Sequence, residues 1–280
     1  MSQQIVYLNG EFTPINEAKI SVLDRGFIYG DGVYEVIPIY NRKALRQSHH
    51  LARLGRSLAK IGMNNPYSEH EWQLLIDKIM ATQAADDQLI YIQVTRGVAK
   101  RAHAFPLEVT PTIFMMTNPM DKISDEVRER GVKCVSMEDL RWQHCDIKST
   151  SLLGNVLAAQ FAVENEATEA IQFRDNFLTE GSASNVWVVK NKQLIGTPLD
   201  GHVLEGIRVS LLEEMCAELN IPYVQRPISR EEVFAADEVL LTSASKEILA
   251  VVQIDGKNIG DGKKGEITQI LYDAYQLKKA

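Results

Sequence analysis

Apolar residues recur along the chain at two spacings, and each spacing predicts a different kind of element. Val6 and Leu8 alternate with polar residues and lead into Asn9-Gly10, which is typical of a hairpin turn. From Ser48 onward, leucines follow at steps of three and four residues, which predicts an amphipathic helix. A second helix is predicted to begin at residues 68–71, because serine followed three residues later by glutamate forms a capping box.

β-branched and aromatic runs predict strands at 33–37, 89–95 and 113–116. The pattern breaks near 117–121, where Asn and Pro mark a boundary. Beyond the break, strands and helices alternate. The expected helices begin at Ser124 and Ser229 and cover 151–166, 206–219 and 265–278; the expected strands cover 132–135, 170–173, 185–189, 239–242 and 251–254. We therefore predict a mixed α+β fold with a smaller N-terminal α/β domain (1–118), a linker (119–123) and a larger C-terminal α/β domain (124–280).

Composition limits the classes of partner and the compartment. The chain has 280 residues, 45% of them apolar, which is enough for a large core without disulfides. Lys and Arg number 30 against 37 Asp and Glu, so the net charge of −7 argues against a nucleic-acid binder. Three cysteines without CxxC spacing fit a reduced cytosol. With neither a signal peptide nor a long apolar run, we expect a cytoplasmic protein without a membrane partner.

Common phosphate-loop and metal motifs are not found in the sequence, which contains no GxxxxGK[ST], no HExxH and no GxGxxG directly after a predicted strand. His49 and His50 are adjacent, and neighbouring helical residues point about 100° apart, so they do not share one ligand face. We interpret them as solvent-exposed or capping residues and expect no metal site.

Three short segments draw attention by their order along the chain. Residues 141–149 place a lysine between a short β-like run and a helix, 178–186 form a Gly/Ser-rich turn before a strand, and 241–248 form a hydroxyl-rich exit from a strand. Each of them alone is typical of a surface lysine or an ordinary polar loop.

Taken together, the ordered segments make the chain resemble the fold-type IV pyridoxal-phosphate enzymes, a family that includes D-amino acid transaminase, branched-chain aminotransferase and aminodeoxychorismate lyase. The similarity covers nearly the whole chain. It rests on residues 24–26, 30–36, 50–54, 145–149, 179–182 and 242–245. It implies a two-domain fold with pyridoxal 5'-phosphate (PLP) bound between the halves.

The resemblance implies a role for three residues in the chemistry. Lys148 matches the lysine that holds PLP as an internal Schiff base and that, once displaced, carries the proton between the substrate α-carbon and C4′ of the cofactor. Glu180 matches the carboxylate that faces the pyridine nitrogen and keeps it protonated. Arg53 matches the arginine that binds the phosphate through paired hydrogen bonds.

Other residues match the surroundings of the ring and of the phosphate. By resemblance these are Arg141 near the ring oxygen, Leu204 behind the ring, and Ile207, Arg208, Ser243 and Ala244 in the phosphate cup. Arg208 and Ala244 replace hydroxyl residues of the family pattern, and Ala183 replaces a serine near the ring. Each lost hydroxyl bond costs about 1 kcal/mol. We expect Arg208, or Ser243 and Ser245, to compensate for them.

The substrate is indicated by a basic loop bounded by Gly and Pro. In D-amino acid transaminase, an Arg-x-His pair from the neighbouring subunit joins a tyrosine to bind the substrate carboxylate; Arg101, His103 and Tyr34 match these positions. The resemblance thus implies a homodimer that transfers amino groups from D-alanine or D-glutamate to 2-oxoglutarate or pyruvate, by ping-pong through a pyridoxamine form.

Three alternatives remain open at this point. The first is a 4-amino-4-deoxychorismate lyase, which uses the same cofactor to release pyruvate. The second is a branched-chain L-amino acid aminotransferase. The third, suggested only by the altered phosphate cup, is a cofactor-free binding or regulatory protein.

Overall fold

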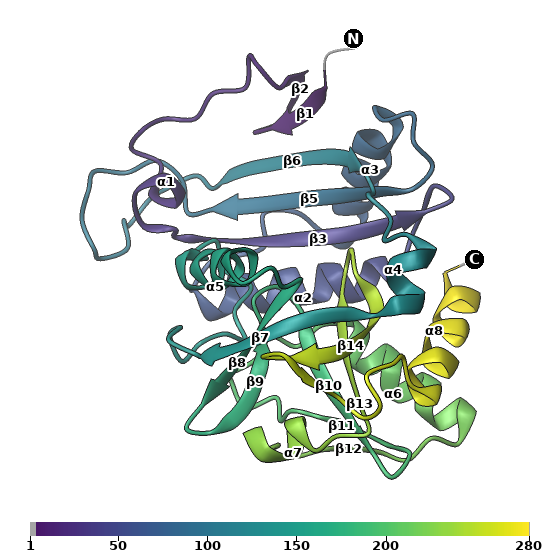
Figure 1. Ribbon diagram of the computed structural model, residues 1–280. Coiled ribbons are helices and arrows are strands. Elements are labelled where there is room, and N and C mark those ends of the chain that lie inside the picture. The colour runs from purple at the N-terminus through teal and green to yellow at the C-terminus, as the bar shows by residue number, and fades with distance from the viewer. Residues whose placement is uncertain (1–3, 280) are drawn as a thin grey trace. The chain divides into compact units, whose positions relative to one another are not determined.

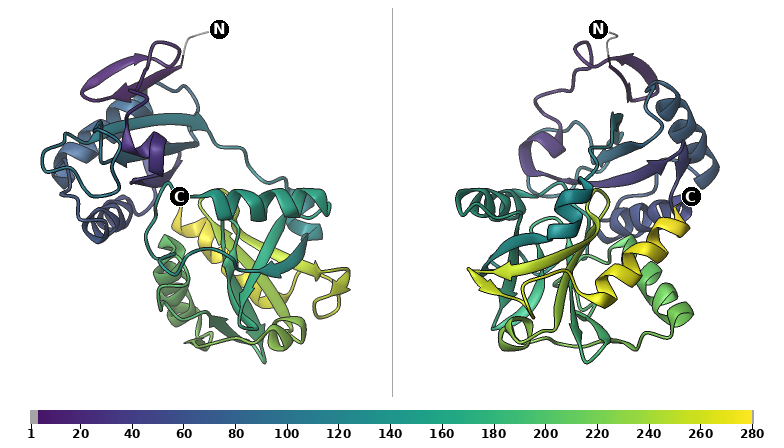
Figure 2. Two further views of the ribbon diagram at one scale, coloured as in Figure 1. Left: turned by 90° about the vertical axis from the view of Figure 1, so that its left-hand side faces the viewer. Right: turned by 45° about the vertical axis from the view of Figure 1, so that its right-hand side comes forward.

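The computed structural model describes residues 4–279, which form two compact units (Figures 1 and 2). Unit 1 is the described chain up to Met120 together with Ile147–Leu152. Unit 2 comprises Asp121–Asp146 and the chain from Leu153 onward. The sequence analysis assigned Lys148 to the C-terminal domain, whereas in the structure its segment groups with unit 1.

Unit 1 is built on a six-stranded antiparallel sheet with the strand order β2-β1-β6-β5-β3-β4. Its elements are β1 (Ile5–Leu8), β2 (Glu11–Pro14), α1 (Arg25–Tyr29), β3 (Gly32–Tyr40), β4 (Lys43–Ala44), α2 (Gln47–Lys60), α3 (Glu69–Ala81), β5 (Gln88–Thr95) and β6 (Thr112–Pro119). Leucines of α2 and Trp72 of α3 pack with isoleucines of β3 and β5 into one core. The predicted capping box at Ser68 and Glu71 is confirmed.

Unit 2 contains a nine-stranded sheet with parallel and antiparallel pairs, in the order β12-β11-β10-β13-β14-β7-β8-β9, with β15 beside β14. Its strands are β7 (Val132–Glu138), β8 (Glu169–Arg174), β9 (Phe177–Gly181), β10 (Asn185–Lys190), β11 (Gln193–Gly196), β12 (Tyr223–Gln225), β13 (Glu238–Ser243), β14 (Glu247–Ile254) and β15 (Lys257–Asn258). The two sheets confirm the predicted mixed α and β class.

The helices of unit 2 are α4 (Asp125–Arg130), α5 (Leu153–Glu164), α6 (Ile207–Leu219), α7 (Arg230–Phe234) and α8 (Glu266–Lys278). Helices α6 and α8 lie side by side, and α8 also packs on β13 and β14 (Figure 2). The helix α5 packs instead on β7 and β8. None of the helices among residues 4–279 has the length and apolar character needed to cross a membrane.

Two local interpretations were wrong. Residues 178–181 were read as part of a turn, but they lie on β9, paired with β8; the turn is confined to residues 182–184. His50 was read as exposed or capping, but it is buried on α2, because its ring bonds to the carboxylate of Glu35 on β3. A partner 15 positions away decides the burial of His50, and helical periodicity carries no information about such a partner.

Candidate active site

Lys148 lies beside β3 in unit 1. Its carbonyl accepts a hydrogen bond from the Tyr34 N–H at 2.9 Å, and its own N–H donates to Ser57 Oγ at 3.2 Å. The Nζ atom lies 4.1 Å from the centroid of the Tyr34 ring, which is a cation–π distance. The structure thus brings together two residues, Lys148 and Tyr34, that the sequence analysis assigned to the same site. The lysine is half-buried, with a main chain fixed by strand and helix.

Arg53 is buried on α2 and is bound to Glu35 of β3. Its Nε and Nη2 donate to the two carboxylate oxygens at 2.7 and 2.8 Å, and His50 Nδ1 lies 2.8 Å from Oε2. Burial alone raises the pKa of Glu35, but the adjacent Arg53 and then His50 outweigh it and hold that pKa well below its ordinary value. The fork of hydrogen bonds fixes the orientation of the guanidinium that the sequence assigned to the phosphate.

Replacing Glu35 by glutamine should lower the free energy of unfolding by about 3–5 kcal/mol at neutral pH, since removal of one partner leaves a buried charge uncompensated. The folded-state pKa is depressed, so this stabilisation should be fully present above the ordinary value of 4.5 and should decrease progressively as the pH falls from there through the depressed folded-state pKa. Denaturant unfolding of wild type and variant at pH 7 and at a series of pH values below 4.5 measures both effects. Equal unfolding free energies at pH 7 would contradict the prediction.

Arg101 and His103 lie on the exposed loop between β5 and β6. Both contact the ring of Tyr29 at the end of α1: the Arg101 guanidinium carbon and the His103 ring centroid each lie 5.5 Å from its centroid. The Tyr29 hydroxyl is buried without a hydrogen-bond partner among the described residues. Tyr29 was missed in the sequence, where it gives no signal beyond lying next to Gly30.

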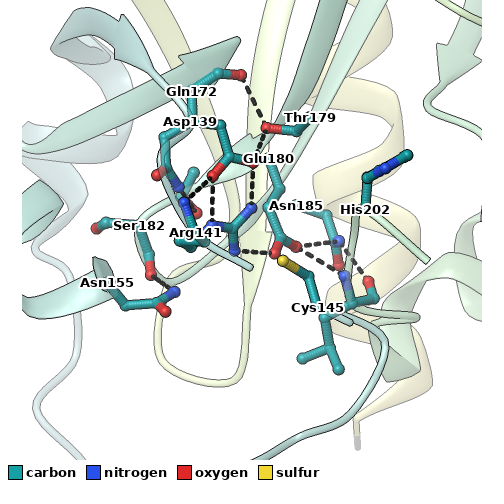
Figure 3. Close-up of polar contacts among 12 residues, drawn as sticks. Asp139, Arg141, Cys145, Asn155, Gln172, Thr179, Glu180, Ser182, Asn185 and His202 are labelled. Atoms are coloured by element: carbon teal, nitrogen blue, oxygen red, sulfur yellow. Dashed lines mark hydrogen bonds and ion pairs between the residues drawn. The ribbon is translucent and has the colours of Figure 1, made fainter. Parts of the chain in front are cut away.

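Glu180 is the last residue but one of strand β9 in unit 2, and its carboxylate is held on both oxygens (Figure 3). Arg141 Nη1 donates to Oε1 at 2.5 Å, and the Leu204 N–H donates to Oε2 at 3.0 Å. Asn185 Nδ2 lies 3.5 Å from Oε2 and donates to the Leu204 carbonyl at 2.8 Å. Burial raises the pKa of Glu180, and Arg141 offsets only part of this rise.

Asp139 in turn orients Arg141. Its carboxylate accepts from Nε and Nη2 of Arg141, each at 2.9 Å, and from the Thr179 hydroxyl at 2.9 Å (Figure 3). Asp139 and Asn185 were missed as site residues, because their roles depend on side-chain contacts that no motif spacing reveals. The sequence placed Arg141 near a ring oxygen, and in the structure it bonds to the carboxylate of Glu180.

The expected phosphate cup surrounds the start of α6. Gly206 is the N-cap and makes no side-chain capping bond, and an added Cβ there would meet Asn185 Oδ1 at 2.0 Å. Arg208 in the first turn donates from Nη2 to the Tyr275 hydroxyl at 2.8 Å and to the Ala244 carbonyl at 3.3 Å. Ser243 Oγ accepts from the Lys246 N–H at 3.0 Å.

The groups of unit 2 fit PLP in their chemistry. Arg208 Nε is a buried donor without a partner among the described residues, and it belongs to the first turn of a helix without a side-chain cap. Such a set of donors suits an anion such as a phosphate. Glu180 is a buried carboxylate, which suits a protonated ring nitrogen. From this part of the chain the cofactor requires two features. One is a hydrogen-bond acceptor for its protonated ring nitrogen, and the other is a group of donors for its phosphate.

Comparison with known proteins also indicates a PLP-dependent enzyme. The family model described as amino-transferase class IV matches residues 32–254. The D-alanine aminotransferase of Staphylococcus aureus (strain MSSA476) is 41% identical over 272 residues, which are 97% of this chain and 96% of that protein.

Two solved aminotransferase structures share the fold. The Escherichia coli branched-chain amino acid aminotransferase has a TM-score of 0.93 at 22% identity, and the match covers 98% of this chain and 94% of its own. A hypothetical aminotransferase from Mycobacterium tuberculosis in its PLP-bound form has a TM-score of 0.84 at 19% identity, covering 99% of each chain. The match of the family model and the identity to a full-length relative establish that the chain belongs to class IV of the aminotransferases, the PLP-dependent enzymes whose substrates are small molecules.

Proposed function

We propose that the enzyme transfers amino groups between D-amino acids and 2-oxo acids in a ping-pong sequence, with D-alanine and D-glutamate as donors and 2-oxoglutarate and pyruvate as acceptors. The proposal is supported chiefly by the 41% identity to a D-alanine aminotransferase along nearly the entire chain. It is also supported by Arg101 and His103, two side chains whose N–H donors suit a carboxylate and which contact the same ring, that of Tyr29.

Bound PLP supplies an aldehyde that takes up the amino group and a ring that accepts the electron pair of the substrate α-carbon. Lys148 is assigned the covalent link to that aldehyde. Once a substrate amine had displaced it, Lys148 Nζ would take the proton from the α-carbon and return it at C4′. The Tyr34 ring, whose centroid lies 4.1 Å from Nζ in the structure, would limit the positions of this amine.

We assign Glu180 to the position that faces the ring nitrogen of the cofactor. A carboxylate that faces this nitrogen stabilises a proton on it and so favours electron flow into the ring. The bonds from Arg141 and the Leu204 N–H fix the plane of the Glu180 carboxylate and keep it from rotating. We assign the Leu204 side chain to packing against the back of the cofactor ring.

The phosphate is assigned to Arg53 and to the cup formed by Ile207, Arg208, Ser243 and Ala244. Arg208 stands where a hydroxyl residue is usual, and its Nε is an unpaired buried donor among the described residues. A phosphate oxygen bound there would receive a charge-assisted hydrogen bond, which is roughly twice as strong as a neutral one. One such bond offsets the two hydroxyls that the cup lacks.

We assign binding of the substrate carboxylate to three residues, Arg101, His103 and Tyr34. Fixing this group decides which side of the α-carbon meets Lys148, and therefore which enantiomer reacts. We further propose that the enzyme is a cytoplasmic homodimer in which Arg101 and His103 serve the site of the other subunit. The three free cysteines, all buried, agree with a reducing compartment.

The absorbance of the purified holoenzyme tests the proposed function. D-alanine should shift the cofactor absorbance within seconds and L-alanine should not, and D-alanine with 2-oxoglutarate should give steady production of pyruvate and D-glutamate. Preference for L-leucine would instead identify a branched-chain enzyme. Pyruvate released over many turnovers from 4-amino-4-deoxychorismate without an acceptor would identify a lyase, and a protein that binds no PLP would overturn catalysis altogether.

A further inference from the structure

Two short motifs of the sequence, Asp24-Arg25-Gly26 and Gly30-Asp31-Gly32, have no role in the chemistry assigned so far. The first contains the N-cap and the first two residues of α1, and the second begins at its C-cap. In the structure, Asp31 Oδ2 accepts from Nε of Arg25 at 2.7 Å and from Nε of Arg96 at 2.8 Å. Burial opposes the charge on Asp31, but the two arginines outweigh it and lower its pKa. One ionised carboxylate therefore joins two buried arginines.

Arg25 uses its remaining nitrogens to hold the loop that carries Arg101 and His103. Its Nη1 donates to the Ala102 carbonyl at 2.6 Å, and its Nη2 donates to the His103 carbonyl at 3.2 Å. The Ala104 carbonyl lies 3.4 Å from Nη1. A guanidinium presents its donors in one rigid plane, so fixing Nε through Asp31 also fixes the directions in which Nη1 and Nη2 point.

Arg96 holds the next residue of the same loop. Its guanidinium carbon lies 3.6 Å from the centroid of the Phe105 ring, and its Nη2 donates to the Ile61 carbonyl at 2.7 Å. Asp31, Arg25 and Arg96 form what we call the loop clamp. The clamp contacts residues 102–105, which directly flank or include the two side chains assigned to the substrate.

The loop has neither helix nor strand over residues 99–111, and residues 101–105 are exposed. An exposed irregular loop is ordinarily mobile, and binding to mobile groups costs the free energy of ordering them. The clamp supplies this order in advance through hydrogen bonds to main-chain carbonyls and a contact with the Phe105 ring, which use none of the side-chain donors of Arg101 and His103.

We propose that Asp31 is a positioning residue for the substrate carboxylate: through Arg25 and Arg96 it fixes the loop that presents Arg101 and His103, and thereby sets the affinity and the preference for D- over L-substrates. This inference rests on the proposed function, because it takes the carboxylate-binding role of the loop from there. It adds a residue that touches neither substrate nor cofactor and connects the two unused motifs to specificity.

Replacing Asp31 by asparagine tests the clamp in the holoenzyme. Asparagine keeps the size but removes the charge that holds two arginines. We expect KM for D-alanine to rise about 10-fold and the ratio of D- to L-alanine activity to fall several-fold, with kcat changed less than about threefold. Arg101→Ala sets the upper limit of the KM effect. Limited trypsin digestion, which needs no activity, should cut after Lys100 or Arg101 several times faster in the variant.

Two further variants make the result decisive. Asp237→Asn removes a carboxylate paired with Lys190 at 2.9 Å in unit 2, and it should change none of these readouts. Arg25→Lys keeps the charge but loses the fork to the two carbonyls, so it should reproduce the effects of Asp31→Asn even where that variant folds poorly. Unchanged KM, enantiomer ratio and cleavage rate in both clamp variants would overturn the inference. A wild type inactive on D-alanine would overturn the proposed function, while the digestion still tests the clamp.

Discussion

Lys148→Ala enzyme should have no measurable transaminase activity, a loss of at least about 10⁴-fold. The substitution removes two functions at once: the amine that forms the covalent link with the cofactor and the base that moves the proton between the α-carbon and C4′. Initial rates with D-alanine and 2-oxoglutarate measure the loss. The visible absorbance of the lysine-bound cofactor should disappear with it, while the phosphate contacts still retain some PLP.

Lys190→Ala is the matched control, because Lys190 is an exposed lysine paired with Asp237 in unit 2 and should keep full activity. A small primary amine added to the Lys148→Ala enzyme should restore a fraction of the rate, since it replaces the lost base. If Arg101 serves the site of a neighbouring subunit, mixing Lys148→Ala with Arg101→Ala protein should regenerate active sites. Full activity of the Lys148→Ala enzyme would refute the role of the lysine.

The elements that could be predicted from the sequence are those that depend on neighbouring positions. The helix after Ser68 follows from a capping box and a periodic apolar face, and both signals lie within one short segment. The family could be recognised for a different reason: several weak motifs occur in a fixed order, and the match of the family model to residues 32–254 confirms that reading.

The details that sequence patterns missed depend on contacts between distant positions. Residues 147–152 join unit 1 because they pair with β3, more than 100 positions earlier, through bonds such as that from the Tyr34 N–H to the Lys148 carbonyl. A boundary drawn from Pro and Asn cannot detect a segment that returns to the first unit after the boundary.

The candidate site shows the same limit. Lys148, Glu180 and Arg53 could be named from motifs, but the groups that orient them could not. Glu35 holds Arg53 across strand and helix, and Asp139 is connected to Glu180 by hydrogen bonds through Arg141. Residue type and spacing suffice to recognise a chemically necessary group, whereas a supporting side chain is recognised only by the bond that it makes.

Glu180→Gln should lower kcat by about 10²–10³-fold while PLP remains bound. Glutamine has nearly the same shape, so packing against Leu204 and Asn185 is preserved, but it carries no charge to stabilise a proton on the ring nitrogen. Removal of one preorganised electrostatic group from a buried site typically has an effect of this size. Stopped-flow absorbance of the first half-reaction with D-alanine measures the step directly, and the absorbance of the resting enzyme reports the bound cofactor.

A second buried glutamate separates this electrostatic effect from a general loss of stability. Glu247 in unit 2 is buried and ion-paired with Arg128 at 2.8 Å, much as Glu180 is paired with Arg141. Glu247→Gln should therefore lower the melting temperature about as much as Glu180→Gln does, yet change kcat less than about twofold. If both variants lost activity in proportion to their stability, Glu180 would be a structural residue and the assignment to the ring nitrogen would fail. If only Glu180→Gln lost activity, the loss would come from the charge at this position, because burial and ion pairing are common to the two glutamates.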